Sequence, residues 1–129
     1  MRLLLDTHVL LWWLAEPERL PDEVVEAIRD TDNQVFLSTA SVWEMAIKSS
    51  LGKLDLGTSL PALVSDVTAK QKFEELPIAH PHAVLVAEFP QHHRDPFDRI
   101  LVAQAIVEGL TLVTADQAVM QYDADLWRV

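Results

Sequence analysis

Four acidic residues, widely separated along the chain, are the candidates for chemistry: Asp6, Glu44, Asp98 and Asp116. Carboxylates held close together raise one another's pKa, so a site that gathers them needs a cation to keep them ionised. Oxygen ligands favour hard cations such as Mg²⁺ or Mn²⁺. One or two such ions suit phosphodiester hydrolysis, because they activate an attacking water and stabilise the leaving oxygen. This chemistry depends on whether the fold brings the four acids together.

The elements that must position these acids alternate between strands and helices. Short apolar runs predict strands at 2–5, 34–38, within 73–78, 111–116 and 126–129. Helical spacing of apolar residues predicts helices at 8–15, 21–30, 41–54, 58–72, 82–89, 96–109 and 117–122, with Gly109 ending the helix at 96–109. This alternation predicts an α/β fold with a parallel sheet covered by helices on both faces.

In such a fold the four acids are predicted to meet at the carboxyl edge of the sheet, where parallel α/β sheets bind their ligands. Asp6 directly follows the strand at 2–5, and Asp116 directly follows the residues TLVTA. Glu44 and Asp98 are expected in the first turns of helices that start at the same edge. The sequence therefore predicts one acidic site built from four distant segments.

Each acid also has a structural interpretation, because acids commonly begin helices. The segments SVWE at 41–44 and DPFD at 95–98 both fit capping boxes. Asp6 and Asp116 could each cap the helix that follows. Separate caps have no reason to converge, however, whereas metal ligands must. Asp95 is an additional acid that we interpret as a cap alone.

Composition limits the class of protein. The 129 residues are half hydrophobic and 23% charged, which predicts a single globular domain over 1–129. There is no cysteine, so a metal would need oxygen or imidazole ligands. The net charge of −10 argues against binding nucleic acid through bulk charge, although a bound metal reverses the charge locally.

The N-terminal apolar run does not fit an export signal or a membrane span. Asp6 and His8 interrupt it, and no small-residue cleavage site follows. A membrane-spanning helix needs roughly 18 or more apolar residues, which no segment offers. We therefore expect a cytosolic protein that does not enter the membrane.

Three segments resemble PIN-domain ribonucleases, and most of all the VapC-like toxins of bacterial type II toxin–antitoxin systems. They are LLLDTHVLLWWL, SVWEMAIKSSLGKL and HHRDPFDRILVAQAIVEGLTLVTAD. The resemblance runs from Asp6 nearly to the C-terminus, and its motifs are specific in combination. It implies a three-layer sandwich with a central five-stranded parallel sheet flanked by helices.

The resemblance also implies a function and roles for the acids. It implies a Mg²⁺-dependent endoribonuclease (Mn²⁺ being an alternative ion) that cuts single-stranded or looped RNA. A cognate antitoxin would keep it inactive, and a homodimer is expected. Asp6 and Asp98 match direct metal ligands, while Glu44 and Asp116 match residues that bind directly or through water and help to activate the attacking water.

Two other functions fit an aspartate after the first strand less well. Phosphatases with an aspartate nucleophile need a second aspartate two positions further on, and here that position is His8. A non-catalytic phosphoreceiver module needs an acidic pair after the first strand and a phosphoacceptor after a middle strand. The chain offers neither of these features.

Several other residues could serve the site or have structural roles. Thr7 and Thr114 match hydroxyl positions beside the family's acids, and His8 could face the site. The other histidines lack the spacing of a helical zinc motif, so solvated loop histidines are the favoured interpretation. Those histidines are His80, His82, His92 and His93.

The aromatic and basic residues have similar alternatives. Trp43 and Trp127 are expected in the core or an interface. Trp12 and Trp13 are adjacent, so one of them is a candidate for a partner or dimer surface. Three basic residues near the predicted edge could contact phosphates, although solvation or an acidic partner fits equally well: Lys48, Arg94 and Arg99.

Overall fold

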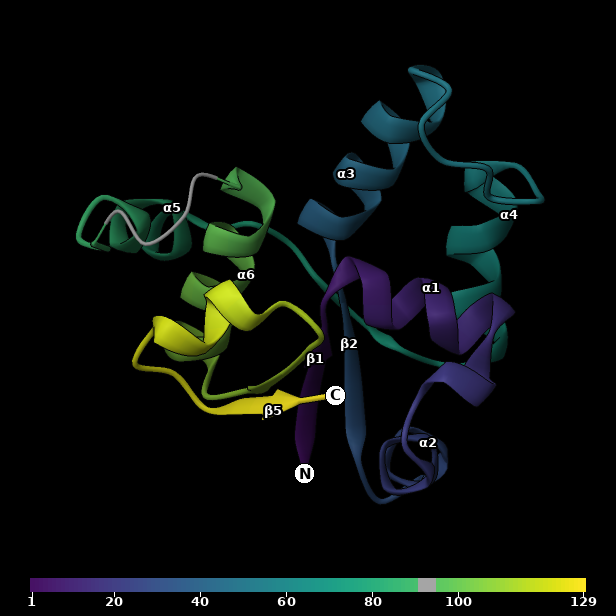
Figure 1. Cartoon of the computed structure of the whole chain (residues 1–129), viewed down its shortest axis with the longest axis horizontal. Coiled ribbons are helices and arrows are strands. Elements are labelled where there is room, and N and C mark those ends of the chain that lie inside the picture. Colours follow the sequence, from purple (N-terminus) through teal and green to yellow (C-terminus); the bar gives the residue numbers. More distant parts are fainter. Residues whose placement is uncertain (91–94) are drawn as a thin grey trace.

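The computed structural model describes residues 1–90 and 95–129. Within these residues, five parallel strands form one sheet in the order β3-β2-β1-β4-β5 (Figure 1). The strands are β1 (Arg2–Leu5), β2 (Gln34–Ser38), β3 (Glu74–Leu76), β4 (Thr111–Thr114) and β5 (Leu126–Arg128). The predicted strands and the parallel α/β class are confirmed.

Helices connect consecutive strands. They are α1 (Thr7–Ala15), α2 (Asp22–Arg29), α3 (Thr39–Ser50), α4 (Leu60–Ser65), α5 (His80–Val86) and α6 (Pro96–Glu108). Shorter turns of helix are η1 (Pro17–Arg19), η2 (Asp66–Lys70) and η3 (Gln117–Gln121). The single helix expected at 58–72 is therefore α4 continued by η2, which is a π-helical turn. None of the helices in the described ranges is long and apolar enough to cross a membrane.

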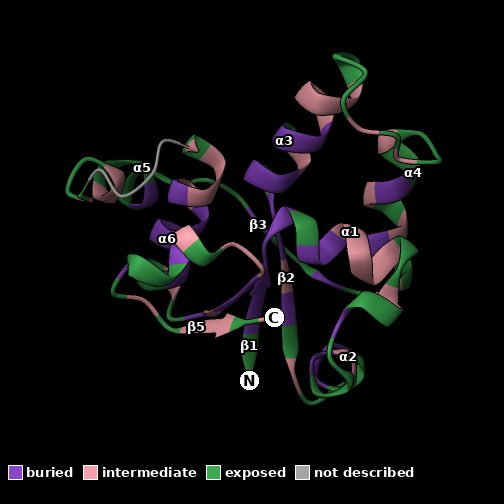
Figure 2. Cartoon of the chain, viewed as in Figure 1, coloured by how far each residue is buried: buried purple, intermediate pink, exposed green. Residues whose placement is uncertain are grey.

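Two hydrophobic clusters, one on each face of the sheet, hold the layers together. Leu3 and Leu5 of β1 pack with residues of α1, α2, α3 and α4. Leu4 of β1 and Leu112 of β4 pack on the other side with residues of α6. Figure 1 shows the two groups of helices on either side of the sheet, and Figure 2 shows that β1 and β2 are largely buried. The predicted three-layer sandwich is confirmed.

Three helices begin at the carboxyl edge of the sheet because a polar side chain caps each of them. Asp6 caps α1, Ser38 caps α3 and Asp95 caps α6. The cap of α1 directly follows β1, and the cap of α3 is the last residue of β2, so in both places the chain turns from strand into helix without a loop. As predicted, α6 ends at Gly109, whose φ of 67° is one that glycine adopts without strain.

Candidate active site

Asp6 and Asp116 lie just beyond the ends of the neighbouring strands β1 and β4. Asp6 is 4% exposed, and its carboxylate accepts hydrogen bonds from the backbone N–H groups of Val9 (2.8 Å) and Ala115 (3.3 Å). The Thr114 hydroxyl links the two acids: it hydrogen-bonds with the Asp6 carboxylate and accepts from the backbone N–H of Asp116 (3.0 Å). These contacts fix the orientation of Asp6.

Glu44 reaches the same edge from α3. Our prediction that Ser41 caps this helix, with Glu44 in its first turn, is wrong. The helix starts directly after β2, and the Ser38 hydroxyl caps it by accepting from the backbone N–H of Ala40 (3.0 Å). Ser41 instead accepts a hydrogen bond from the Thr7 hydroxyl (3.0 Å), which holds the starts of α1 and α3 together. Glu44 is consequently in the second turn, where it is buried.

A lysine neutralises this buried carboxylate. The Lys48 Nζ atom lies 2.5 Å from Glu44 Oε2, one helical turn further along α3. The Glu44 side chain is 4% exposed, whereas that of Lys48 is 38% exposed. The hydrogen bond to Glu44 raises the pKa of Lys48, so the ammonium group stays charged at neutral pH. Of the alternatives for Lys48, the structure shows an acidic partner.

Asp95 and Asp98 both lie at the start of α6. As predicted, Asp95 is the cap: its carboxylate accepts from the backbone N–H groups of Phe97 (2.9 Å) and Asp98 (3.3 Å), with Pro96 as the first helical residue. Asp98 is half-buried in the first turn. By fixing where α6 begins, the Asp95 cap determines the position of Asp98 near the edge of the sheet.

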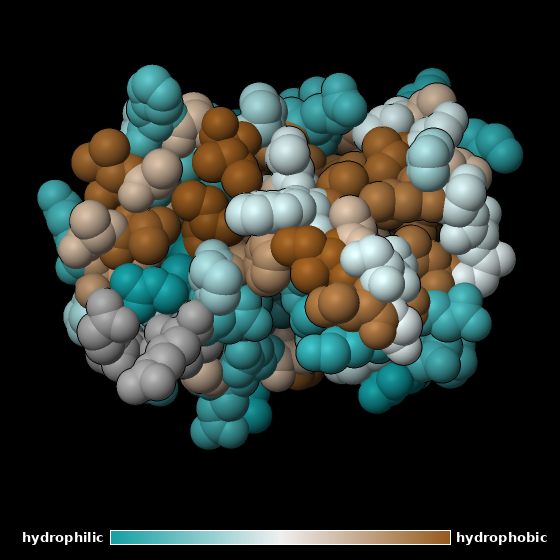
Figure 3. Space-filling model, turned by 90° about the horizontal axis from the view of Figure 1, so that it is seen from above, coloured by the Kyte–Doolittle hydropathy of each residue, from teal (hydrophilic) through white to brown (hydrophobic). Residues whose placement is uncertain are grey.

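These acids line one pocket of about 290 Å³ at the carboxyl edge. Its lining residues are Asp6, His8, Trp12, Glu44, Asp95, Asp98, Ala115 and Asp116. The structure therefore brings together all four acids singled out in the sequence, and His8 does face the site. Asp95 is a fifth acid on the pocket wall. Our interpretation of Asp95 as a cap alone did not include this position beside the site. Figure 3 views the molecule from this edge and shows apolar patches separated by polar areas.

Crowding changes the protonation of the pocket. Burial and the charge of Asp95, together with a hydrogen bond that protonated Asp98 donates to the Asp116 carboxylate and the charges of Asp6 and Asp116, raise the pKa of Asp98 to about 8. Burial also raises the pKa of Asp6, although its hydrogen bonds oppose this. The protein therefore supplies too little positive charge to balance the carboxylates of this pocket, and at neutral pH a proton on Asp98 reduces their repulsion.

The raised pKa of Asp98 makes the stability of the metal-free protein depend on pH. An unfolded aspartate titrates near pH 4, so between about pH 4 and about pH 8 the folded protein holds a proton that the unfolded chain has released. The free energy of unfolding should therefore fall as the pH rises through this window, by about 2 kcal/mol for a partly exposed group. Urea unfolding in EDTA at about pH 5 and about pH 9 measures this change.

Asp98→Asn is the control for this titration. In this variant, most of the decrease of the free energy of unfolding with rising pH should disappear, because asparagine has no proton to release. Equal pH dependence in the two proteins would show that Asp98 does not titrate in this range. Adding Mg²⁺ to the original protein at the higher pH should restore the stability that deprotonation removes.

The donor set fits a divalent cation. Among the described residues, no three histidine, aspartate or glutamate side chains converge closely enough to enclose a metal ion by themselves. Mg²⁺, however, is usually held by one or two carboxylates and keeps several waters, so it does not need such a cage. Asp6 and Asp98 are the pocket carboxylates with raised pKa values, and a bound cation would lower both values again.

Comparison with known proteins identifies the family. A family model for the PIN domain matches residues 3–125. The chain belongs to the PIN-domain family. It is also 30% identical over 116 residues to Ribonuclease VapC22 of Mycobacterium tuberculosis, covering 88% of this chain and 86% of that protein. The resemblance seen in the sequence is confirmed, and it favours neither the phosphatase nor the phosphoreceiver alternative.

Solved structures share the fold of this PIN domain. VapBC2 from Rickettsia felis, bound to a DNA fragment from its promoter, matches with a TM-score of 0.73 at 15% identity, covering 99% of this chain and 98% of that chain. VapBC-5 from Mycobacterium tuberculosis, a member of the VapBC family of toxin–antitoxin systems, matches with a TM-score of 0.60 at 22% identity, with the same coverage. At these identities the likeness concerns the fold alone.

The tryptophans of the PIN domain lie differently from our expectation. Trp12 and Trp13 are both half-buried against the core on the α1 side, so neither is left as a free surface residue. Trp12 also lines the acidic pocket, and the Trp13 indole donates to the Gln71 side chain (2.7 Å). Trp127 packs on the same core, as expected. Trp43 is 57% exposed and meets the Phe97 ring edge to face at 5.2 Å.

Arg99 proves to be structural. It is 8% exposed, and its guanidinium group donates to the backbone carbonyls of Val86 (3.1 Å) and Pro90 (3.3 Å). This ties the first turn of α6 to the end of α5, so the suggestion that Arg99 meets phosphates is wrong. The suggestion that Arg94 contacts a phosphate, and the interpretation of His92 and His93 as solvated, concern residues outside the described ranges.

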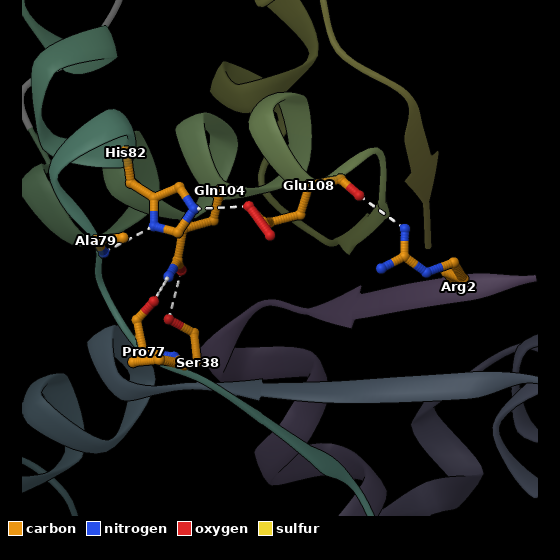
Figure 4. A network of polar contacts seen from close by, with 7 residues as sticks. All are labelled: Arg2, Ser38, Pro77, Ala79, His82, Gln104 and Glu108. Atoms are coloured by element: carbon orange, nitrogen blue, oxygen red, sulfur yellow. Dashed lines mark hydrogen bonds and ion pairs between the residues drawn. The ribbon is translucent and has the colours of Figure 1, made fainter.

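His82 is not a solvated loop histidine, as we had expected. It is 2% exposed in the first turn of α5, where Nδ1 accepts from the backbone N–H of Ala79 (2.9 Å) and Nε2 lies 3.2 Å from a Glu108 carboxylate oxygen. Nearby, the Gln104 side chain links the Ser38 hydroxyl (2.5 Å) to the Pro77 carbonyl (3.3 Å) (Figure 4). This network fastens α5 and α6 to the end of β2.

Proposed function

We propose that this PIN domain is the toxin of a toxin–antitoxin pair and acts as a Mg²⁺-dependent endoribonuclease on single-stranded or looped RNA. The observation that carries the proposal is the pocket in which Asp6, Glu44, Asp98 and Asp116 meet. A relative named as a ribonuclease supports the activity, and likeness to VapBC proteins supports the biological setting. We infer that the chain works as a single domain in the cytosol.

In this proposal the acids divide the work of the site. Asp6 and Asp98 would bind the metal directly, and Glu44 and Asp116 would bind it directly or through water. A bound Mg²⁺ or Mn²⁺ ion would supply a more acidic water and positive charge for the phosphodiester. The Val9 and Ala115 N–H groups hold the Asp6 carboxylate in place. Glu44 and Asp116 would help to accept the proton that the attacking water loses.

A cognate antitoxin would silence this site by covering the acidic edge, with a basic residue among the carboxylates. An apolar groove of about 470 Å³, formed by α3, α5 and α6 and the chain around Ile78, supports a protein partner in this region. The exposed Trp43 and the half-buried Phe97 lie on its wall, one residue before Glu44 and Asp98 respectively. The homodimer remains part of the proposal, since apolar surface of this kind favours association.

Removal of divalent metal should abolish RNA cleavage. Purified protein freed of antitoxin is expected to cut single-stranded RNA in Mg²⁺, to stop in EDTA, and to recover when Mg²⁺ or Mn²⁺ is returned in excess. The reason is that the unneutralised pocket repels a polyanion and lacks an activated water. Gel analysis of a labelled RNA follows the cleavage, with Asp98→Asn protein, in which cleavage should be strongly reduced, as the control for contaminating nucleases. Equal cleavage with and without EDTA would rule out the metal mechanism.

A further inference from the structure

Lys48 is a cation set against the wall of a pocket that is otherwise acidic. None of the described residues that line the pocket is a lysine or an arginine. Lys48 touches this wall through its ion pair with Glu44, and the charges of Asp95 and Asp98 also act on it. Its ammonium group therefore lies within reach of the electrostatic field of three of the pocket's carboxylates.

The geometry of this pair leaves part of the ammonium group available at the surface. A lysine has three N–H donors, of which one is directed to Glu44 Oε2. The Glu44 side chain is almost completely buried, whereas more than a third of the Lys48 side chain is exposed. The pair thus runs from the buried wall of the pocket to the solvent, with its positive end outermost.

We propose that Lys48 is a phosphate-contacting residue of this site: Glu44 holds its ammonium group at the rim, where it binds a backbone phosphate of the RNA. The inference rests on the proposed ribonuclease function. A phosphate next to the one being cut must approach several carboxylates, and a fixed lysine offsets that repulsion. An ammonium group binds phosphate as a point charge, so Lys48 contributes affinity and register without reading the bases.

Binding of a short fluorescein-labelled single-stranded RNA tests this role. All proteins carry Asp98→Asn so that the RNA stays intact, and affinity is measured by fluorescence anisotropy in Mg²⁺ at several KCl concentrations. Lys48→Met should weaken binding by roughly three- to tenfold. It should also reduce the slope of log affinity against log salt by about 0.7, the value for one phosphate contact with a single strand. Lys48→Arg should retain both the affinity and the slope.

Lys53→Met is the matched control, because Lys53 is exposed, carries the same charge and does not line the pocket. An unchanged salt slope in Lys48→Met, or an equal reduction in Lys53→Met, overturns the proposal. If Lys48→Met is unfolded because Glu44 is left unpaired, Lys48→Gln replaces it, since its uncharged amide can still donate a hydrogen bond to Glu44, and the same loss of slope is expected. If the protein without any substitution neither binds nor cleaves RNA, both the ribonuclease function and this inference fail. If that protein binds and cleaves RNA but the salt slope of Lys48→Met is unchanged, the ribonuclease function stands and only the Lys48 contact is ruled out.

Discussion

Asp98→Asn is expected to reduce RNA cleavage by on the order of 100- to 1,000-fold while leaving the fold intact. Asparagine is close in size to aspartate but cannot supply the negative charge that a divalent cation needs at this position. The metal-free variant should also be more stable than the original protein above about pH 8, because it no longer forces a charged carboxylate beside Asp95, Asp116 and Asp6. Initial cleavage rates in saturating Mg²⁺ and urea unfolding together measure the two effects.

Asp95→Asn separates the cap from the metal site. Asparagine caps helices about as well as aspartate, so α6 should still begin at Pro96. If Asp95 is chiefly a cap, this variant should retain cleavage within about tenfold of the original, far above Asp98→Asn. Asp32→Asn, at an exposed acid away from the pocket, controls for the change in net charge. Equal losses in the two helix-start variants would mean that Asp95 belongs to the metal site as well.

Arg99→Met is expected to lower the free energy of unfolding by about 2–4 kcal/mol. The guanidinium group is buried and donates to the Val86 and Pro90 carbonyls, which methionine cannot do. The substitution therefore leaves polar groups without their donors and loosens the end of α5 from the start of α6. Urea or thermal unfolding of the metal-free protein measures the loss.

The control for Arg99 is an arginine that makes little contact. Arg128 is exposed, and its described hydrogen bond to the Gln117 side chain is long, at 3.4 Å. Arg128→Met should therefore change the stability by no more than about 0.5 kcal/mol. A similar small change for Arg99→Met would show that the hydrogen bonds of its guanidinium group are readily replaced by water.

The sequence was sufficient to predict the sheet and the meeting of the acids, because both follow from simple regularities. Continuous apolar runs such as those at 2–5 and 111–114 are typical of strands buried on both faces, and both are strands here. A residue that follows a parallel strand must lie at its carboxyl edge, which placed Asp6 and Asp116. The D-P-F-D segment likewise gave the start of α6, since a capping aspartate followed by proline is a strong local signal.

The errors came from contacts between segments that lie far apart in the chain. Ser38 and Ser41 are both acceptable caps, and only the direct passage from β2 into α3 selects Ser38. The Ser41 hydroxyl instead accepts a hydrogen bond from the hydroxyl of Thr7, which is distant in the sequence. His82 was expected to be solvated because its partner Glu108, 26 positions away, cannot be identified from local sequence. Arg99 resembled a phosphate ligand because the carbonyls that it binds cannot be identified from local sequence.

The pairing of β1 with β4 also determines when the acidic pocket can exist. Residues 3–5 align with residues 111–113, and the Asp6 N–H donates to the Val113 carbonyl at 3.0 Å. During synthesis, more than a hundred residues must therefore leave the ribosome before β1 can meet this neighbour. Until then Asp6 has neither the Ala115 N–H nor the Thr114 hydroxyl to hold it. A nascent or truncated chain that lacks β4 consequently cannot assemble the site, however well its first helices form.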